Sequence, residues 1–244
     1  MTLAPPYERI VFDCDSTLSH IEGIDVLCQN SDPSVAAAVE ALTNQAMAGD
    51  IPLEDVYGKR LELCSPRQVD VMKVGSLYVQ KAVPGGKELI SGLRSLGKDI
   101  VIVSGGLQLA VVSFATWLGL RDQAVHAVKV LFEADGTFHD YDRDSPLARN
   151  GGKSEVLAAL PPARTVVVGD GVTDAETRDV VDAFICFSGV VHRQEAADRA
   201  DAVLATPSLA PLIDLVCTPD ERDRLARDPR HRQLLAMAGR AKQT

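Results

Sequence analysis

The chain has 244 residues, of which 46% are hydrophobic and 24% are charged, and its formal net charge is −9. These ordinary globular values allow one large or two modest domains with a sizeable core. The acidic balance argues against a nucleic-acid partner, which needs a basic face, and no apolar run is long enough to span a bilayer. Because the N-terminal MTLAPPYE lacks a basic and then apolar leader, we expect a cytoplasmic protein that binds neither membrane nor nucleic acid.

The cysteines are odd in number and scattered, and they form no C-x-x-C pair. This pattern favours reduced thiols over a disulfide framework or a zinc site. The five are Cys14, Cys28, Cys64, Cys186 and Cys217.

The stretch RIVFDCDSTLS, residues 9–19, begins with an apolar run that ends abruptly in Asp13. We expect a buried strand over about 9–13, followed at its carboxyl end by Asp13 and Asp15. Two carboxylates at i and i+2 face one side of an extended segment, which suits a metal ion or an acid–base pair. The alternative is a strand that runs into an ordinary polar turn. Cys14 points to the opposite face and is expected to be buried packing.

Residues 20–80 show helical patterns and no convincing strand. One helix is expected over SDPSVAAAVEALTNQAMAG, with Ser31 or Asp32 as its cap and Gly49 at its end. Two more begin at Pro52 and Pro66. Since sixty helical residues are too many for a plain crossover, we expect an inserted helical module above the carboxyl end of the first strand.

From residue 85 onward, helical and strand patterns alternate. A helix over GGKELISGLRSLGKD precedes a strand at 100–106, and a hairpin is expected at 128–142 around Asp135-Gly136. TVVVG, AFICF and AVLA are further strands, and the charged segment 217–244 is expected to be a solvated helical tail. The pattern predicts an α/β fold, a Rossmann-like doubly wound, mainly parallel sheet with an inserted small α-helical bundle cap. We expect a core of residues 1–18 and 81–244 and a cap of residues 19–80.

Three predicted strands end in residues that can carry chemistry. They are followed by Asp13, by Ser104-Gly105-Gly106 and by Asp170. Because the carboxyl ends of parallel strands share one edge of a sheet, these residues should converge. The acids, with Asp174 four residues beyond Asp170, can bind Mg²⁺, which prefers oxygen ligands. Taken singly, each of these two acids also has a purely structural explanation: Asp170 fits an acid in the turn after a strand, and Asp174 fits the cap of a helix.

The remaining polar signals suit a phosphate. The two glycines allow a close backbone approach, the following helix offers its positive end, and Ser104 adds a hydroxyl. Lys153 stands at a helix start, where a cation is disfavoured unless it meets an anion. With the phosphate charge neutralised, one Asp can attack phosphorus and a second can act as acid and base. No nucleotide-binding loop, dinucleotide fingerprint or serine-hydrolase elbow is present.

The motifs DCDST, VSGG, GGKSEV and GDGVTD, in this order, resemble the four motifs of the haloacid dehalogenase superfamily of phosphatases. The helical insertion resembles the small helical cap of that superfamily. IEGIDVL, QAMAGDIPLEDVYGKRLEL, VPGG and VKVLFEADGTF together resemble the phosphoserine phosphatase family. The resemblance implies Mg²⁺-dependent hydrolysis of a small phosphomonoester, O-phosphoserine, through an aspartyl-phosphate.

The resemblance also implies roles. Asp13 is the expected nucleophile and a metal ligand, and Asp15 is the expected acid and base and gives the metal its backbone carbonyl. Asp170 is the third metal ligand, and Asp174 supports the metal. Ser104 and Lys153 complete the catalytic set.

Substrate binding is assigned by the same resemblance. Glu22 matches the acid that pairs with the ammonium group of the substrate, and Arg60 matches the arginine that pairs with the carboxylate of the substrate. Met47 matches a residue that makes an apolar contact. Glu and Arg are also the ordinary charges of a helix surface. The full expected set is Glu22, Met47, Arg60, Ser104, Gly105, Gly106 and Thr173.

The sequence departs from the family pattern at three positions. Leu53 and Leu107 stand where phenylalanine is expected, and Ile21 where an acid is frequent. The alternatives are therefore a phosphatase for another small phosphomonoester, or a catalytically silent binding or regulatory protein on the same scaffold. A dehalogenase is disfavoured because its chemistry does not need this metal set. We expect a monomer or a homodimer.

Overall fold

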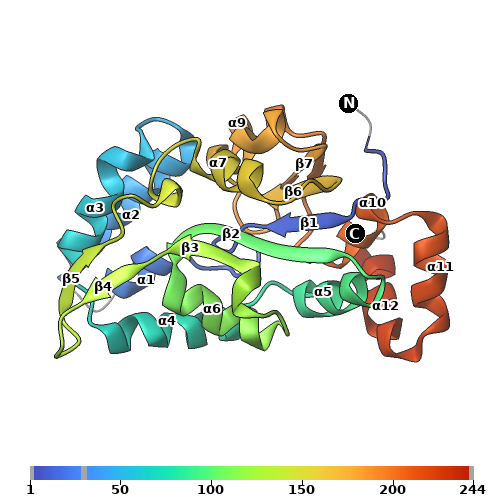
Figure 1. Cartoon of the computed structure of the whole chain (residues 1–244), viewed down its shortest axis with the longest axis horizontal. Helices are drawn as coiled ribbons and strands as arrows, with labels where there is room; N and C mark the ends of the chain where they lie inside the picture. The colour runs from blue at the N-terminus through green and yellow to red at the C-terminus, as the bar shows by residue number, and fades with distance from the viewer. Residues whose placement is uncertain (1–2, 29–31, 242–244) are drawn as a thin grey trace.

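The structure is a computed structural model, which describes residues 3–28 and 32–241. A six-stranded sheet lies at its centre, in the order β3-β2-β1-β6-β7-β8, and every neighbouring pair is parallel (Figure 1). The prediction of a mainly parallel, doubly wound sheet is confirmed. The strands are β1 (Arg9–Phe12), β2 (Asp99–Leu107), β3 (Val125–Val128), β6 (Thr165–Gly169), β7 (Ala183–Phe187) and β8 (Ala202–Leu204).

Helices cover both faces of this sheet, as the nearly continuous apolar runs of its strands require (Figure 1). Helices α5 (Gly86–Ser95) and α6 (Gln108–Trp117) lie on one face, and α7 (Gly152–Ala159) and α9 (Gln194–Arg199) on the other. The short helices are α8 (Val172–Ala175) and α10 (Ile213–Val216), and single 3₁₀ turns lie at Asp122–Ala124, Pro146–Ala148, Glu176–Asp179, Ala210–Leu212 and Pro229–His231.

The register of the sheet brings its functional ends together. Phe12 of β1 pairs with Ile102 of β2 on one side and with Val168 of β6 on the other. The backbone N–H of Asp13 donates to the carbonyl of Val168 at 2.9 Å. Asp13 therefore leaves the sheet beside the end of β6 and beside the part of β2 that leads into Ser104.

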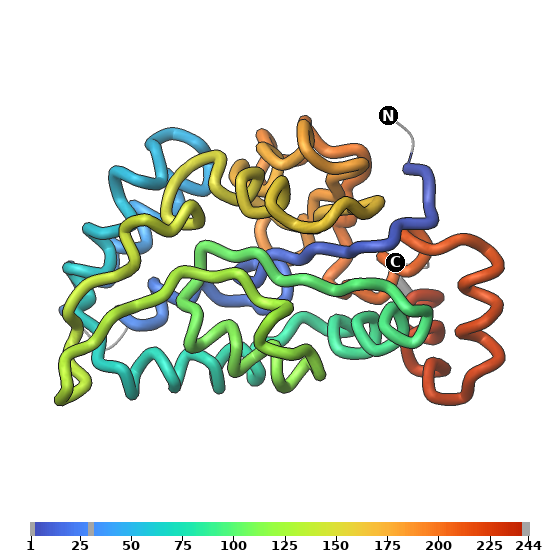
Figure 2. Tube along the Cα trace, viewed as in Figure 1, coloured from blue at the N-terminus to red at the C-terminus, as the bar shows by residue number. Residues whose placement is uncertain are grey.

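Of the five helices that the described residues form between β1 and β2, α5 covers the sheet and the first four make up the inserted module: α1 (Gly23–Cys28), α2 (Pro33–Ala48), α3 (Leu53–Cys64) and α4 (Gln68–Gln80). We call them the cap helices. The Asp32 side chain caps α2 by accepting from the N–H of Ser34, and Gly49 ends the helix with φ +84°, as predicted. Ser31, the alternative cap, lies outside the described residues. The predicted hairpin, β4 (Val130–Phe132) and β5 (Phe138–Tyr141), is confirmed and lies beside α3 (Figures 1 and 2).

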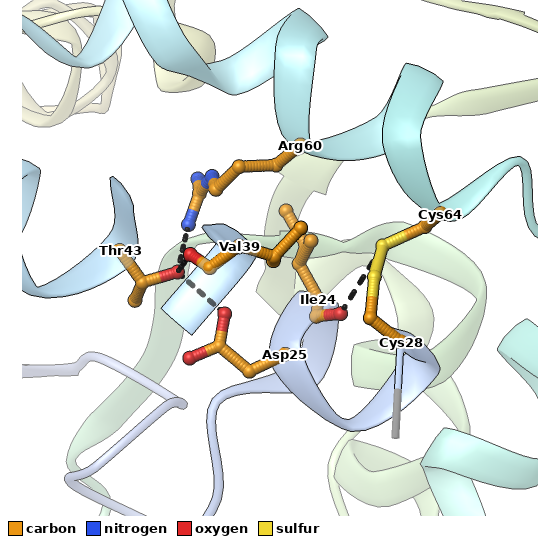
Figure 3. Close-up of a disulfide and its surroundings, with 7 residues drawn as sticks. All are labelled: Ile24, Asp25, Cys28, Val39, Thr43, Arg60 and Cys64. Carbon is orange, nitrogen blue, oxygen red and sulfur yellow. Dashed lines mark hydrogen bonds between the residues drawn. A yellow bond between two sulfur atoms is a disulfide. The ribbon is translucent and has the colours of Figure 1, made fainter. Parts of the chain in front are cut away.

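The expectation that all cysteines are reduced thiols is wrong. Cys28 at the end of α1 and Cys64 at the end of α3 form a disulfide, with their Cα atoms 5.2 Å apart (Figure 3). The two are 36 positions apart in sequence, and only the packing of the cap helices brings them within bonding distance. The other three cysteines are free and buried.

The C-terminal segment is also not the solvated appendage that its charge indicates. Helices α11 (Pro219–Arg227) and α12 (Arg232–Ala241) bury Leu225, Leu234 and Ala238 against the rest of the chain, next to α5 (Figure 1). Glu221 of α11 accepts from the buried ammonium of Lys98 at 2.6 Å. The charged residues form the outer face of the helix pair, and its sparse apolar residues form the inner face.

None of the helices within residues 3–28 and 32–241 is long and apolar enough to cross a membrane.

Candidate active site

Three carboxylates meet at the carboxyl edge of the sheet. Asp13 follows β1, Asp170 follows β6, and Asp174 lies in the first turn of α8. One oxygen from each lies within 4.8 Å of the others, and all three residues are buried. Gly169 makes this approach possible, because a Cβ there would lie 2.1 Å from the carboxylate carbon of Asp174.

This cluster fits a hard divalent cation. Burial, together with nearby negative charges that include Asp13, raises the pKa of Asp170 and of Asp174 to about 7. A cation that accepts only oxygen ligands would relieve this crowding of buried negative charge. The donor set therefore suits Mg²⁺ better than a softer metal.

Lys153 supplies the only positive side chain that the described residues place between Asp13 and Asp174. Its ammonium lies 2.7 Å from Oδ1 of Asp174 and 3.1 Å from Oδ2 of Asp13. Burial alone lowers the pKa of Lys153, but the two carboxylates outweigh it, and the net pKa is raised. Lys153 is therefore charged at neutral pH. The glycine directly before it is required, since a Cβ at Gly152 would lie 1.7 Å from the carbonyl oxygen of Pro146.

Asp15 faces the cap helices rather than the acidic cluster. Its Oδ1 accepts from the Gly23 N–H at 3.0 Å and from the Tyr78 hydroxyl at 2.5 Å. Burial, together with the charges of Glu22 and Asp13, raises the pKa of Asp15 well above its usual value. Asp15 therefore holds a proton more readily than a typical surface carboxylate does. Cys14 between the two acids is fully buried, as expected.

The end of β2 completes the sheet side of the site. Ser104 is buried, and its Oγ accepts from the N–H of Gly106 at 3.0 Å, which leaves its own hydroxyl hydrogen to donate. Gly105 lines the same cavity.

Arg60 and Glu22 face this edge from the cap side. Arg60 is only 4% exposed, and one of its nitrogens, Nη1, donates to the Thr43 hydroxyl at 2.9 Å, which in turn donates to Asp25 (Figure 3). The Nε of Arg60 is buried and has no hydrogen-bond partner within the described ranges. A buried donor without a partner is costly, so Arg60 is prepared for an anion that enters the cavity. Glu22 accepts from the Ser16 hydroxyl at 2.6 Å.

Most of these groups line one cavity of about 40 Å³, which has room for a few water molecules. Of the expected site residues, ten line it: Asp13, Asp15, Glu22, Met47, Arg60, Ser104, Gly105, Lys153, Asp170 and Thr173. Asp174 and Gly106 are not part of the lining. Asp174 lies behind Lys153, and Gly106 acts on Ser104 through its N–H.

Comparison with known proteins agrees with this arrangement. Residues 10–177 match the family model of the haloacid dehalogenase-like hydrolases. The phosphoserine phosphatase of Rattus norvegicus is 34% identical over 197 residues, which cover 79% of this chain and 87% of that protein. The chain belongs to the phosphoserine phosphatase family of haloacid dehalogenase-like hydrolases.

Two solved structures extend the likeness to three dimensions. A phosphoserine phosphohydrolase-like protein from Francisella tularensis has a TM-score of 0.78 at 26% identity and covers 86% of this chain and 100% of that one. A phospho-aspartyl intermediate analogue of phosphoserine phosphatase has a TM-score of 0.73 at 25% identity, with coverage of 87% and 100%.

The structure of this phosphoserine phosphatase family member adds an arginine that sequence reasoning missed. Arg193 lies 2.9 Å from Asp170 and 3.5 Å from Glu22, and it is largely buried. It follows β7, so the convergence of strand ends applied to this fourth strand could have found it. Thr17, also missed, donates to the other oxygen of Asp170 at 2.9 Å.

Three further residues were missed on the cap side. Tyr78 donates to Asp15, and Asp25 carries the network that holds Arg60. Tyr57 lines the cavity and is buried. Nothing in the spacing of these residues distinguishes them from ordinary helix core, and only the packing of the cap helices places them at the site.

Proposed function

We propose that the chain is a Mg²⁺-dependent phosphomonoesterase that hydrolyses O-phospho-L-serine to L-serine and phosphate. One observation carries the proposal: a single cavity is lined by a lysine, a hydroxyl and carboxylates from the sheet edge, and by a buried arginine with an unpartnered Nε from the cap helices, among the described residues. The groups of the sheet edge suit a phosphoryl group, and the arginine suits a carboxylate. The family relationship supports the same substrate.

In the first step, a carboxylate oxygen of Asp13 attacks phosphorus and the bond from phosphorus to the serine oxygen breaks. The product is an aspartyl-phosphate on Asp13. Asp15, whose raised pKa favours its protonated form, donates a proton to the leaving serine oxygen. Because Oδ1 of Asp15 already accepts two hydrogen bonds, we assign the proton to Oδ2.

In the second step, water attacks the phosphorus of the aspartyl-phosphate and gives a proton to Asp15, which is now a base. The bond from phosphorus to Asp13 breaks, and both acids return to their starting states. Lys153 and the Ser104 hydroxyl hold the phosphoryl oxygens and neutralise their charge throughout. The likeness to a solved phospho-aspartyl intermediate analogue supports this route.

Magnesium would be held by carboxylate oxygens of Asp13 and Asp170 and by the backbone carbonyl of Asp15, with Asp174 in support. When bound, it supplies positive charge that offsets the repulsion between the phosphate and the Asp13 carboxylate. The crowding of buried acids, which raises the pKa of Asp170 and Asp174 to about 7, supports a cation at this position.

The cap helices would select the serine part of the substrate. Arg60 can grip the carboxylate with two N–H groups, and Glu22 can pair with the ammonium. Met47 and Leu53 provide apolar wall between them. In this proposal residues 19–80 form the cap domain, and 1–18 with 81–244 form the core that carries the chemistry.

Phosphate release from phosphoserine, with Mg²⁺ and with a chelator, tests the proposal. The panel includes O-phosphoethanolamine, which lacks the carboxylate, O-phospho-3-hydroxypropionate, which lacks the amino group, and sugar and nucleotide monophosphates. We expect phosphoserine to be the best substrate and Asp13→Asn to be inactive. Preference for a compound without the amino or carboxylate group contradicts the substrate, and no Mg²⁺-dependent release from any compound contradicts the enzyme.

A further inference from the structure

A tyrosine of the cap helices forms a hydrogen bond with the sheet edge at the phosphate end of the site. Tyr57, in α3, is 1% exposed, and its hydroxyl donates to the backbone carbonyl of Gly105 at 2.7 Å. Burial raises the pKa of Tyr57, so the hydroxyl keeps its proton at any physiological pH. A donor from the cap thus meets the residue that follows Ser104.

This bond reaches Ser104 through one peptide group. The carbonyl of Gly105 and the N–H of Gly106 belong to the same planar peptide, and that N–H donates to Oγ of Ser104 at 3.0 Å. Tyr57 therefore fixes one end of the peptide whose other end fixes the Ser104 hydroxyl. Hydrogen bonds in such a chain also polarise one another.

The ring of Tyr57 lies between two other parts of the molecule. The guanidinium of Arg60 lies 5.4 Å from its centre, and the ring of Tyr141, from β5 of the hairpin, lies 5.2 Å away. Gly58 leaves room for this packing, since a Cβ there would lie 3.2 Å from Tyr141. One side chain thus contacts the group proposed for the substrate carboxylate and the peptide beside the group proposed for its phosphate.

Tyr57 also accounts for a departure in the sequence. Leu53 stands where the family pattern has phenylalanine, and Tyr57 is one helical turn further on the same face of α3. Both residues line the cavity. Position 57 therefore places an aromatic ring and a hydroxyl beside Leu53 on this wall of the cavity.

We propose that Tyr57 is a positioning residue for phosphoryl transfer: its hydroxyl orients Ser104 through the Gly105–Gly106 peptide when the cap helices lie closed over the sheet edge. This rests on the proposed function, in which Ser104 holds the phosphoryl group. It predicts that the hydroxyl affects how the phosphate group of the substrate is held, and that the ring affects how its carboxylate is held, through Arg60.

Tyr57→Phe tests the hydroxyl alone. We expect kcat/KM for phosphoserine to fall about three- to tenfold, the range for one neutral hydrogen bond. The same loss is expected with O-phosphoethanolamine, because the bond acts on the phosphate end. Tyr57→Ala should cause a further loss with phosphoserine only, because it also removes the ring beneath Arg60.

A double-mutant cycle separates positioning from general structure. In a Ser104→Ala background, Tyr57→Phe should have no further effect, since the group that it orients is absent. Tyr7→Phe is the matched control, because it removes one buried phenolic hydroxyl far from the site, and it should leave kcat/KM unchanged. Thermal unfolding of each variant identifies any loss of folded protein.

A second measurement tests Tyr57 without any hydrolysis of substrate. Binding of inorganic phosphate to the Mg²⁺-loaded protein, measured by calorimetry, should weaken by the same factor in Tyr57→Phe. If the wild type bound phosphate but did not hydrolyse phosphoserine, the substrate assignment would fail while this measurement still tested Tyr57. Unchanged phosphate affinity, or equal losses from Tyr57→Phe with and without Ser104, would overturn the inference.

Discussion

Replacing Arg60 by lysine tests whether the cap recognises a carboxylate. The substitution keeps the positive charge but removes the planar fork and the Nε hydrogen, which has no partner within residues 3–28 and 32–241. Arg60→Lys is preferable to alanine, because alanine would also leave a cavity and the carboxyl of Asp25 without its cation.

The size of the effect follows from the lost contact. A hydrogen bond between a charged donor and a carboxylate contributes about 1.5–3 kcal/mol. Arg60→Lys retains the charge and loses one such bond. We therefore expect kcat/KM for phosphoserine to fall about 10- to 150-fold, mostly through KM, because the contact is made in the bound substrate as well as in the transition state.

The assay compares phosphoserine with O-phosphoethanolamine, which lacks the carboxylate, in steady-state phosphate release. The second substrate should lose less than about twofold, because Arg60 makes no contact that it needs. Lys59→Ala, an exposed neighbour in α3, is the matched control and should match the wild type on both substrates. Equal losses on both substrates would refute the reasoning, since Arg60 would then act only by holding Thr43 and the cap helices.

Three other predictions concern the metal, pH and the disulfide. A chelator should abolish phosphate release, and Mg²⁺ at a hundred times its dissociation constant should stabilise the wild type by about 2.7 kcal/mol, but not Asp170→Asn, in thermal unfolding. The pKa values of Asp170 and Asp174 are raised to about 7 in the folded state, above their values in the unfolded chain, so the stability of the metal-free protein should fall as pH rises from about 4 to about 7. The urea midpoint of unfolding should fall less over this range in Asp170→Asn. An equal fall in the variant and the wild type would contradict a raised pKa at Asp170. Reduction of the Cys28–Cys64 disulfide, which closes a loop of 36 residues, should lower the free energy of unfolding measured in urea by about 2–4 kcal/mol. The reductant should not change the stability of the double variant Cys28→Ser/Cys64→Ser, and an effect on that variant would contradict the role of this disulfide.

The sheet and its chemical edge could be predicted because their signal is local. Apolar runs that stop in Asp13, Ser104 and Asp170 mark buried strands and their carboxyl ends within a few residues of sequence. The rule that parallel strands share an edge then places these residues together, without any knowledge of the helices.

The missed features depend on distances between helices, which periodicity does not contain. The disulfide needs the ends of α1 and α3 to meet, and the Tyr57 hydroxyl needs α3 to lie against the end of β2. The sequence of the C-terminal helices indicates a solvated segment because the charged residues of α11 greatly outnumber the apolar ones that it buries, such as Leu225. In each case the partner lies in an element whose position the sequence pattern leaves open.

The central place of β1 has a consequence for the order in which the protein can fold as it is made. In chain order β1 comes before both of its neighbours in the sheet, which are β2 on one side and β6 on the other, and β6 ends at Gly169. Until about 160 further residues are synthesised, β1 has an open edge, and Asp13 lacks both Lys153 and Asp170. Contacts so distant in sequence form slowly. The nascent chain therefore carries its proposed nucleophile in an unassembled site, and we expect phosphoester chemistry to begin only when the second half of the sheet has joined the first.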